Sequence, residues 1–150
     1  MNILFVCTGN ICRSPSAEAL LRHKLEQRGL ASYTIDSAGV AAYHIGEPPD
    51  HRAIQCAHQY GVDMSPLRAR KVCADDFSSF DLIYAMDNGH LEILRNICPA
   101  PQRHKIKLFN QHIYGAPSDV EDPYYGDQRN FNNMFTKLDE SLDIFIKNHT

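Results

Sequence analysis

The sequence predicts one α/β domain in which helices cover both faces of an open, twisted, four-stranded parallel sheet. Four short strand candidates alternate along the chain with segments of helical spacing, and this alternation is typical of parallel sheets. The 150 residues, of which 43% are hydrophobic, suffice for one full core and contain no repeat, low-complexity tract or linker that would mark a boundary. We therefore treat residues 1–150 as a single domain.

The first part of the chain predicts a strand, a helix and a second strand, which together form a right-handed βαβ unit. Residues 2–6 are the apolar first strand. Apolar residues then recur at helical spacing over residues 15–28. Ser14 is the expected N-cap of this helix, the proline after it suits the first helical position, and Gly29 is the expected end. Residues 33–36 are the second strand.

The later elements keep the same alternation. Residues 39–49 are a loop, and Asp50 is expected to cap the helix that follows. The third strand is continuously apolar, which predicts burial on both faces. A polar loop precedes the last helix, whose apolar stripe we assign to the core. In order, the expected segments are a helix over 50–60, a helical turn over 75–80, a strand over 81–86, a helix over 89–96, a strand over 105–109 and a helix over 128–147.

Eight residues, here called the oxyanion loop, join the first strand to the first helix: Cys7-Thr8-Gly9-Asn10-Ile11-Cys12-Arg13-Ser14. In such a turn the backbone N–H groups point inward and the helix start adds partial positive charge, so an anion can bind. These donors and the Arg13 guanidinium favour the thiolate form of Cys7. A guanidinium also binds two phosphate oxygens at once. The loop therefore predicts nucleophilic attack on phosphorus.

Other polar groups are expected at the same edge of the sheet. Ligands of open α/β sheets bind beyond the carboxyl ends of the strands. Cys7, Ser37, Asp87 and the loop after Phe109 all follow predicted strands. The predicted fold therefore gathers groups that are distant in sequence around the oxyanion loop.

A phosphate ester also needs a proton for its leaving oxygen, and Asp122 is the candidate donor. Pro123 fixes the backbone beside it, and two tyrosines and a glycine follow. Asp119 and Glu121 are nearby competitors for the same role. A nucleophile, a charge clamp and an acid together predict hydrolysis rather than simple phosphate binding.

The oxyanion loop and the stretch Asp122-Pro123-Tyr124-Tyr125-Gly126 resemble the signature loops of the low-molecular-weight protein tyrosine phosphatases, and the likeness covers essentially the whole chain. The resemblance implies a Rossmann-like fold of the phosphotyrosine phosphatase I type. It also implies a cysteine-dependent phosphoric monoester hydrolase that cleaves phosphotyrosine and small aryl phosphates through a phosphocysteine intermediate. No metal or other cofactor is required, because the guanidinium and the loop amides supply the positive charge.

By the same resemblance, Cys7 is the nucleophile, Arg13 the phosphate clamp and Asp122 the general acid and then the general base. Tyrosines are expected to wall a pocket deep enough for phosphotyrosine and too deep for phosphoserine; half-buried packing is their alternative role. The residues expected to bind substrate are Thr8, Gly9, Asn10, Ile11, Cys12, Ser14, Tyr43, Tyr124 and Tyr125. Ser14 is also expected to donate a hydrogen bond to the sulfur, and Asn10, which tolerates left-handed backbone angles, to hold the shape of the loop with Ser37 as a brace.

Two regulatory features are implied by the family. Cys12 can form a reversible disulfide with Cys7 on oxidation, which protects the nucleophile from overoxidation; filling space beneath the loop is its alternative role. The paired tyrosines Tyr124 and Tyr125 can themselves be phosphorylated, which would make a tyrosine kinase a partner.

Four positions depart from the common family pattern. Tyr43 stands where a tryptophan is frequent, and Leu67 replaces a histidine that supports the loop asparagine. Lys71 and His90 stand where glutamine and asparagine are usual. None of the four is a predicted catalytic residue, so we expect them to bear on substrate preference rather than on the reaction.

Composition limits the partners and the compartment. A net charge of −3 gives no electrostatic basis for nucleic-acid binding, and no apolar run approaches the roughly 20 residues that span a bilayer. The start of the chain has no basic leader. Five cysteines, an odd number, predict reduced thiols in the cytoplasm, and no cysteine–histidine cluster predicts a metal site. We expect a monomer or a weak dimer.

Two other functions fit parts of the pattern. Arsenate reductases of a related fold share the oxyanion loop but need two further, closely spaced cysteines, whereas Cys56, Cys73 and Cys98 are far apart in sequence. A non-catalytic phosphate-binding module would need no general acid such as Asp122. Both functions therefore rank below a phosphatase.

Overall fold

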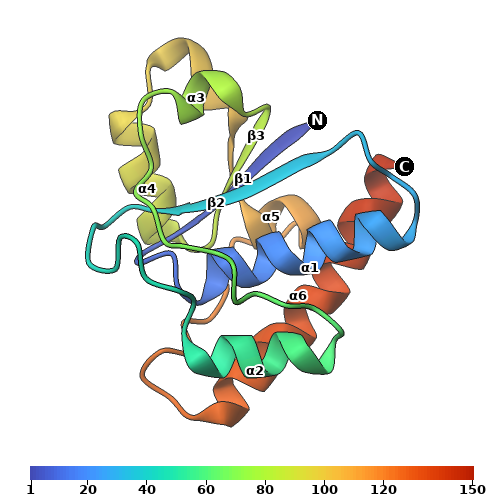
Figure 1. The fold of residues 1–150 in the computed structure, drawn as a ribbon. Helices are drawn as coiled ribbons and strands as arrows, with labels where there is room; N and C mark the ends of the chain where they lie inside the picture. The colour runs from blue at the N-terminus through green and yellow to red at the C-terminus, as the bar shows by residue number, and fades with distance from the viewer.

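The computed structural model describes residues 1–150 and confirms the predicted α/β architecture (Figure 1). Four parallel strands form one sheet in the order β2-β1-β3-β4. β1 is therefore a central strand, and the oxyanion loop that follows it leaves the sheet between the ends of β2 and β3. The strands are β1 (Asn2–Cys7), β2 (Thr34–Gly39), β3 (Leu82–Ala85) and β4 (Ile106–Leu108).

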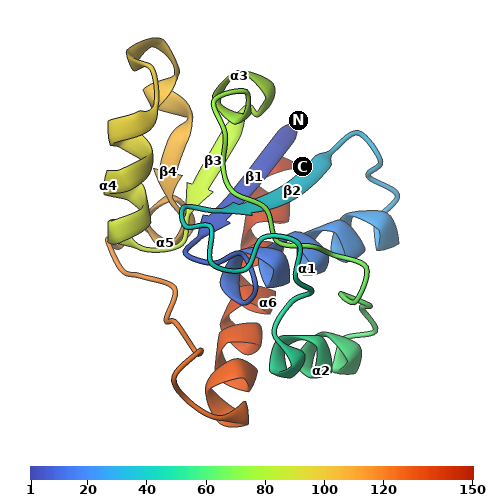
Figure 2. The same ribbon diagram turned by 60° about the vertical axis from the view of Figure 1, so that its left-hand side comes forward.

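Helices cover both faces of the sheet (Figures 1 and 2). Successive residues of β1 point to opposite faces. Ile3 and Phe5 belong to a core of 28 buried residues, and Leu4 and Val6 belong to a second core of 13. The larger core packs against α1 (Arg13–Gln27), α2 (His51–Gln59), α5 (Phe109–Tyr114) and α6 (Gln128–His149), and the smaller against α3 (Asp76–Ser79) and α4 (Asn88–Ile97).

The start of α1 corrects one prediction. The helix begins at Arg13 rather than Pro15, and Ser14 is not its N-cap, because Cys12 occupies that position without a side-chain cap hydrogen bond. The Ser14 hydroxyl lies instead 2.9 Å from Cys7 Sγ. Pro15 is tolerated in the first turn because the first N–H groups of a helix have no partner within it.

The segment after β4 is the other point at which the prediction is wrong. Phe109, predicted as the last residue of the strand, begins α5, and Gly115 ends that helix with a φ of 77°. Phe109 and Ile113 share one helical face and are both buried, but the polar residues between them obscure this pattern. A short 3-10 helix, η1 (Ala100–Lys105), also follows α4, where only the end of a helix was predicted.

The remaining elements are confirmed apart from their ends. β2 continues to Gly39 instead of ending at Asp36. Asp50 and Asp87 accept backbone N–H groups at the starts of α2 and α4, and Gly29, with a φ of 68°, follows the end of α1. None of the helices combines the length and the apolar character needed to cross a membrane.

The end of β2 holds the oxyanion loop against the sheet. The N–H of Val40 donates to the Cys7 carbonyl at 2.9 Å, and the N–H of Ala41 donates to the Thr8 carbonyl at 3.0 Å. Gly39 lies so close that a Cβ at this position would be 2.6 Å from the Thr8 carbonyl oxygen. Cβ atoms essentially never lie this close to another atom, so a larger residue than glycine would displace the loop.

Candidate active site

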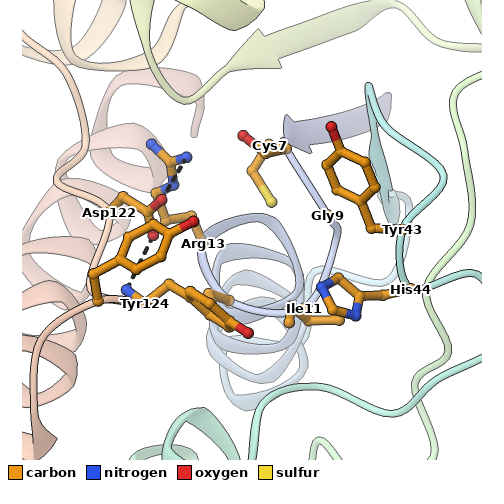
Figure 3. A pocket seen from close by; sticks show the side chains of 11 residues that line it. Cys7, Gly9, Ile11, Arg13, Tyr43, His44, Asp122 and Tyr124 are labelled. Atoms are coloured by element: carbon orange, nitrogen blue, oxygen red, sulfur yellow. Dashed lines mark hydrogen bonds and ion pairs between the residues drawn. The ribbon is translucent and has the colours of Figure 1, made fainter.

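The oxyanion loop forms the floor of a cavity of about 210 Å³ at the carboxyl edge of the sheet. Figure 3 shows the Cys7 sulfur pointing into this cavity, with Arg13, Asp122 and Tyr124 on one side and Tyr43 on the other. The structure brings together residues from β1, α1 and two distant loops. The lining residues are Cys7, Thr8, Gly9, Ile11, Cys12, Arg13, Tyr43, His44, Asp122, Tyr124 and Tyr125.

Two residues predicted to bind substrate do not line the cavity. The side chains of Asn10 and Ser14, both residues of the oxyanion loop, are buried and do not face the cavity. Asn10 has a left-handed backbone, with a φ of 58°, and its Nδ2 donates to the hydroxyls of Ser14 and Ser37, each at 2.9 Å. Its Oδ1 accepts the backbone N–H of Arg70 at 2.9 Å. The Asn10 side chain therefore supports the loop from within the protein. Its oxygen is held by the backbone N–H of Arg70 rather than by a side chain at position 67, where this chain has Leu67.

The bracing network ends on a buried carboxyl group. Ser37 Oγ donates to Glu18 Oε1 at 2.6 Å, and Arg22 Nη2 lies 2.6 Å from Glu18 Oε2. Burial raises the pKa of Glu18, while hydrogen bonds from Ser37 and the charge of Arg22 oppose that rise. Asn10 and Ser37 thus connect the Ser14 hydroxyl, and through it the Cys7 sulfur, to Glu18, one turn further along α1.

Arg13 is buried at the rear of the cavity, with only 4% of its side chain exposed. Its Nη1 donates to Asp87 Oδ2 at 2.9 Å and to the Val120 carbonyl at 3.0 Å, and its Nη2 lies 3.7 Å from Asp122 Oδ2. Burial would raise the pKa of Asp87, but the hydrogen bond from the backbone N–H of His90 and the hydrogen bond and charge of Arg13 outweigh it and hold that pKa below its usual value. A charged Asp87 therefore fixes the guanidinium.

His90 is a site residue that the sequence identified only as a departure from the family pattern. Its Nε2 lies 2.8 Å from Thr8 Oγ1, and its backbone N–H donates to Asp87 Oδ1 at 2.8 Å. Burial lowers the pKa of His90 to about 4, so the ring is neutral at pH 7. The start of α4 therefore contacts the oxyanion loop through Thr8 and through Arg13.

The 122–126 loop closes the other side of the cavity. Asp122 Oδ1 accepts the N–H of Tyr124 at 3.1 Å, and 41% of the Asp122 side chain is exposed. The rings of Tyr124 and Tyr125 pack edge to face, with centroids 5.0 Å apart. The competing carboxylates, Asp119 and Glu121, do not line this cavity; Asp119 accepts hydrogen bonds from Asn88 at the start of α4.

Aromatic side chains surround the mouth of the cavity. Tyr43 and Tyr125 are 78% and 90% exposed, so neither side chain is part of the core. His44, which was not predicted as a site residue, lies between Gly9 and Tyr124: its Nδ1 is 2.7 Å from Glu47 Oε2, and its ring centroid is 6.5 Å from that of Tyr124. A flat ring can enter between these groups.

The second thiol of the loop, Cys12, is buried beside the cavity floor. Burial, followed by the negative charge of Asp50, raises the pKa of Cys12 well above its usual value. Cys12 is therefore a neutral thiol at pH 7, and all five cysteines of the chain are unpaired.

Known sequences match this chain along nearly its whole length. A family model described as low molecular weight phosphotyrosine protein phosphatase matches residues 2–149. The protein of that description from Schizosaccharomyces pombe is 39% identical, and the match covers 98% of this chain and 96% of the relative. The protein of that description from Homo sapiens is 37% identical, with 97% and 94% covered.

Solved structures are similar over the same extent. The protein tyrosine phosphatase from Entamoeba histolytica, with Hepes in its active site, has a TM-score of 0.91 at 35% identity, covering 97% of this chain and 94% of that one. The YwlE arginine phosphatase, as a C7S mutant with a phosphorylated active site serine, has a TM-score of 0.92 at 30% identity, covering 99% and 95%.

Proposed function

Because the chain belongs to the low molecular weight phosphotyrosine protein phosphatase family and is a hydrolase of that family, we propose that it cleaves phosphotyrosine in proteins, and small aryl phosphates, through a phosphocysteine intermediate. The observation that carries the proposal is the convergence of Cys7, Arg13 and Asp122 on one cavity. A thiolate, a guanidinium and a carboxyl group are the three groups that such a reaction needs.

In the first step, the Cys7 thiolate attacks phosphorus in line with the leaving oxygen. A bond forms between sulfur and phosphorus, the bond to the phenol oxygen breaks, and Asp122 gives its proton to that oxygen. Arg13 and the loop N–H groups bind the three equatorial oxygens, whose negative charge they match best in the transition state. The bond from Arg13 to Asp87 supports this role, because it holds the guanidinium in place before substrate arrives.

In the second step, the ionised Asp122 takes a proton from a water molecule that attacks phosphorus, and the bond between sulfur and phosphorus breaks to release inorganic phosphate. Ser14 assists by donating its hydroxyl hydrogen to the departing sulfur, a role that its 2.9 Å distance from Cys7 Sγ supports. The phosphorylated serine in the YwlE arginine phosphatase, a similar protein, also supports a covalent intermediate.

Substrate choice follows from the depth and the walls of the cavity. Cys7 lies at the floor and is 3% exposed, so the phosphoryl group must stand on a side chain long enough to reach it. Tyr43 and Tyr124 offer flat apolar surfaces for the ring of phosphotyrosine. Phosphoserine is too short to make both contacts.

Arsenate reduction is disfavoured by the positions of the other cysteines. Cys56 is buried in the larger core and Cys98 in the smaller one, on opposite faces of the sheet, while Cys73 is exposed. Reduction of arsenate takes two electrons from thiols, so a relay that supplies them through Cys7 needs neighbouring thiols that can exchange disulfides. These cysteines offer no such sequence of partners.

The proposal extends to regulation and setting. Oxidation of Cys7 by a peroxide to the sulfenic acid, followed by attack of Cys12 with loss of water, would give a disulfide that thiols reduce again.

Tyr124 and the largely exposed Tyr125 are the proposed targets of a tyrosine kinase. A reducing cytoplasm suits the five unpaired cysteines, and a monomer or weak dimer is the proposed state.

The test compares aryl phosphate hydrolysis by the wild type, Cys7→Ser and Asp122→Ala. Cys7→Ser should abolish turnover, whereas Cys73→Ser, which changes an exposed cysteine outside the cavity, should not. Asp122→Ala should lower kcat/KM by roughly 10²-fold or more for poor leaving groups, with inhibition by inorganic phosphate retained. Full activity of Cys7→Ser would refute the nucleophile, and wild-type kcat/KM in Asp122→Ala with phenyl phosphate would refute the acid.

A further inference from the structure

Arg52, in the first turn of α2, reaches across to the loop that holds Asp122. Its Nη2 donates to the Tyr124 carbonyl and its Nη1 to the Gly126 carbonyl, each at 3.0 Å. Both acceptors belong to the 122–126 loop. No backbone hydrogen bond joins this loop to α2, so the hydrogen bonds between the loop and the helix come from the guanidinium.

The guanidinium is itself held from two further sides. Its Nε and Nη2 donate to the two carboxylate oxygens of Asp50, each at 3.0 Å, and its Cζ lies 4.4 Å from the centroid of the Phe131 ring in α6. Burial would raise the pKa of Asp50, but hydrogen bonds from Arg52 outweigh it and lower that pKa. The pair is therefore charged at neutral pH, and the fork of Arg52 has one orientation.

The same short segment also contacts the oxyanion loop. The backbone N–H of Asp50 donates to the Ile11 carbonyl at 2.8 Å. Asp50 thus touches the loop of the nucleophile, while Arg52, bonded to Asp50, touches the loop of the acid. On the far side, the N–H of Tyr124 donates to Asp122 Oδ1, so the peptide units on both sides of Tyr124 are fixed.

We propose that Arg52 is a positioning residue for the general acid: it fixes the 122–126 loop relative to the oxyanion loop, so that the Asp122 carboxyl group stands beside the leaving oxygen. The inference rests on the function proposed above and adds a residue that does not line the cavity. Proton transfer depends steeply on the distance between donor and acceptor, and misplacement by about 1 Å can lower a rate roughly 10²-fold.

The chain contains a matched control for Arg52. Asp127 and Arg129 repeat the arrangement of Asp50 and Arg52 at the start of α6: the aspartate caps the helix, and the arginine two residues later returns to its carboxylate at 3.3 Å. The Arg129 side chain is 88% exposed and bonds to no loop carbonyl. A variant of Arg129 therefore shows the effect of losing an arginine that bonds to a capping aspartate, without the loss of a contact to the loop.

The experiment measures kcat/KM for aryl phosphates whose phenols differ in acidity. Phenyl phosphate needs full protonation of its leaving oxygen, whereas p-nitrophenyl phosphate needs little. Arg52→Met should lower kcat/KM about tenfold for the first substrate and less than about threefold for the second, with inhibition by inorganic phosphate unchanged. Arg129→Met should match the wild type with both. If Arg52→Met does not fold, Arg52→Lys, which cannot bind both carbonyls and the carboxylate, takes its place.

A double mutant separates positioning from a general structural effect. When Asp122→Ala has removed the acid, adding Arg52→Met should cause no further loss with phenyl phosphate. An equal loss with both substrates, or the same loss with and without Asp122, would overturn the inference for Arg52. If the loss of kcat/KM in Asp122→Ala is the same for both leaving groups, the assignment of Asp122 as the acid fails. If Asp122→Ala depends on the leaving group but Arg52→Met has wild-type kcat/KM, only the inference for Arg52 fails.

Discussion

The oxyanion loop depends on one residue with an unusual backbone. Asn10 is the only non-glycine residue with a positive φ, a conformation that costs most side chains about 1–2 kcal/mol. Its amide offsets this strain with bonds to Ser14, Ser37 and the backbone of Arg70. The preference of asparagine for left-handed angles was readable from the sequence, and so was a brace at Ser37. The partner on Arg70 was not, because a backbone N–H leaves no mark in a sequence.

The pH dependence of stability tests the burial of His90. Its pKa is about 4 in the folded protein and about 6.5 when exposed, so folding favours the neutral ring. This contribution is complete above pH 6.5 and is lost as the pH falls toward 4, by at most about 1.4 kcal/mol per pH unit. Urea unfolding of the wild type and His90→Asn between pH 7 and pH 4.5 should give a shallower decline in the variant. Parallel curves for the two proteins would contradict a neutral, buried His90.

The ends of strands and the starts of helices hold the loops of the site in place. The carboxyl ends of β1 and β2 fix the oxyanion loop, the start of α4 fixes Arg13 through Asp87, and the start of α2 fixes the 122–126 loop through Arg52. Each of these helices begins with an aspartate cap that also serves the site. The caps were predictable at Asp50 but their second partners were not.

Gly39 tests the contact between β2 and the oxyanion loop. Gly39→Ala puts a Cβ into the Thr8 carbonyl oxygen, and because backbone cannot yield as a flexible side chain would, the loop must shift. We expect kcat/KM to fall by roughly 10²-fold and inhibition by inorganic phosphate to weaken with it. Urea unfolding, measured in parallel, distinguishes a shifted loop from an unfolded protein. A folded Gly39→Ala with wild-type phosphate inhibition would mean that the contact does not shape the loop.

For the whole molecule, the alternation of strands and helices decided both the fold and the gathering of Cys7, Asp87 and the segment before Asp122 at one edge. Parallel strands alone impose this arrangement. Two kinds of feature escaped prediction. The cap of α1 was wrongly assigned to Ser14, because Cys12 occupies that position, although the Ser14 hydroxyl does lie beside Cys7 Sγ as expected. α5 was missed because only Phe109 and Ile113 carry its pattern. Arg52 and His90 act through tertiary contacts that no local pattern encodes.

Residues of the larger core that touch neither the cavity nor Arg52 should support the fold without shaping the chemistry. Phe135, on α6, is fully buried and stacks on Tyr60 with centroids 5.8 Å apart. Phe135→Ala should lower the free energy of unfolding by about 3–5 kcal/mol, measured by urea titration at 25 °C. Where the variant is still folded, its KM for an aryl phosphate should equal that of the wild type. A changed KM at full folding would mean that α6 packing reaches the cavity.

The central claim, that phosphorus passes through the Cys7 sulfur, is tested most directly by trapping the intermediate. The enzyme is mixed with p-nitrophenyl phosphate, quenched within the first turnover and examined by phosphorus NMR and by mass spectrometry of its peptides. The account predicts one phosphoryl group per molecule, bonded to sulfur and located on Cys7. A phosphoryl group on another residue, or turnover with no labelled protein at any time point, would contradict it.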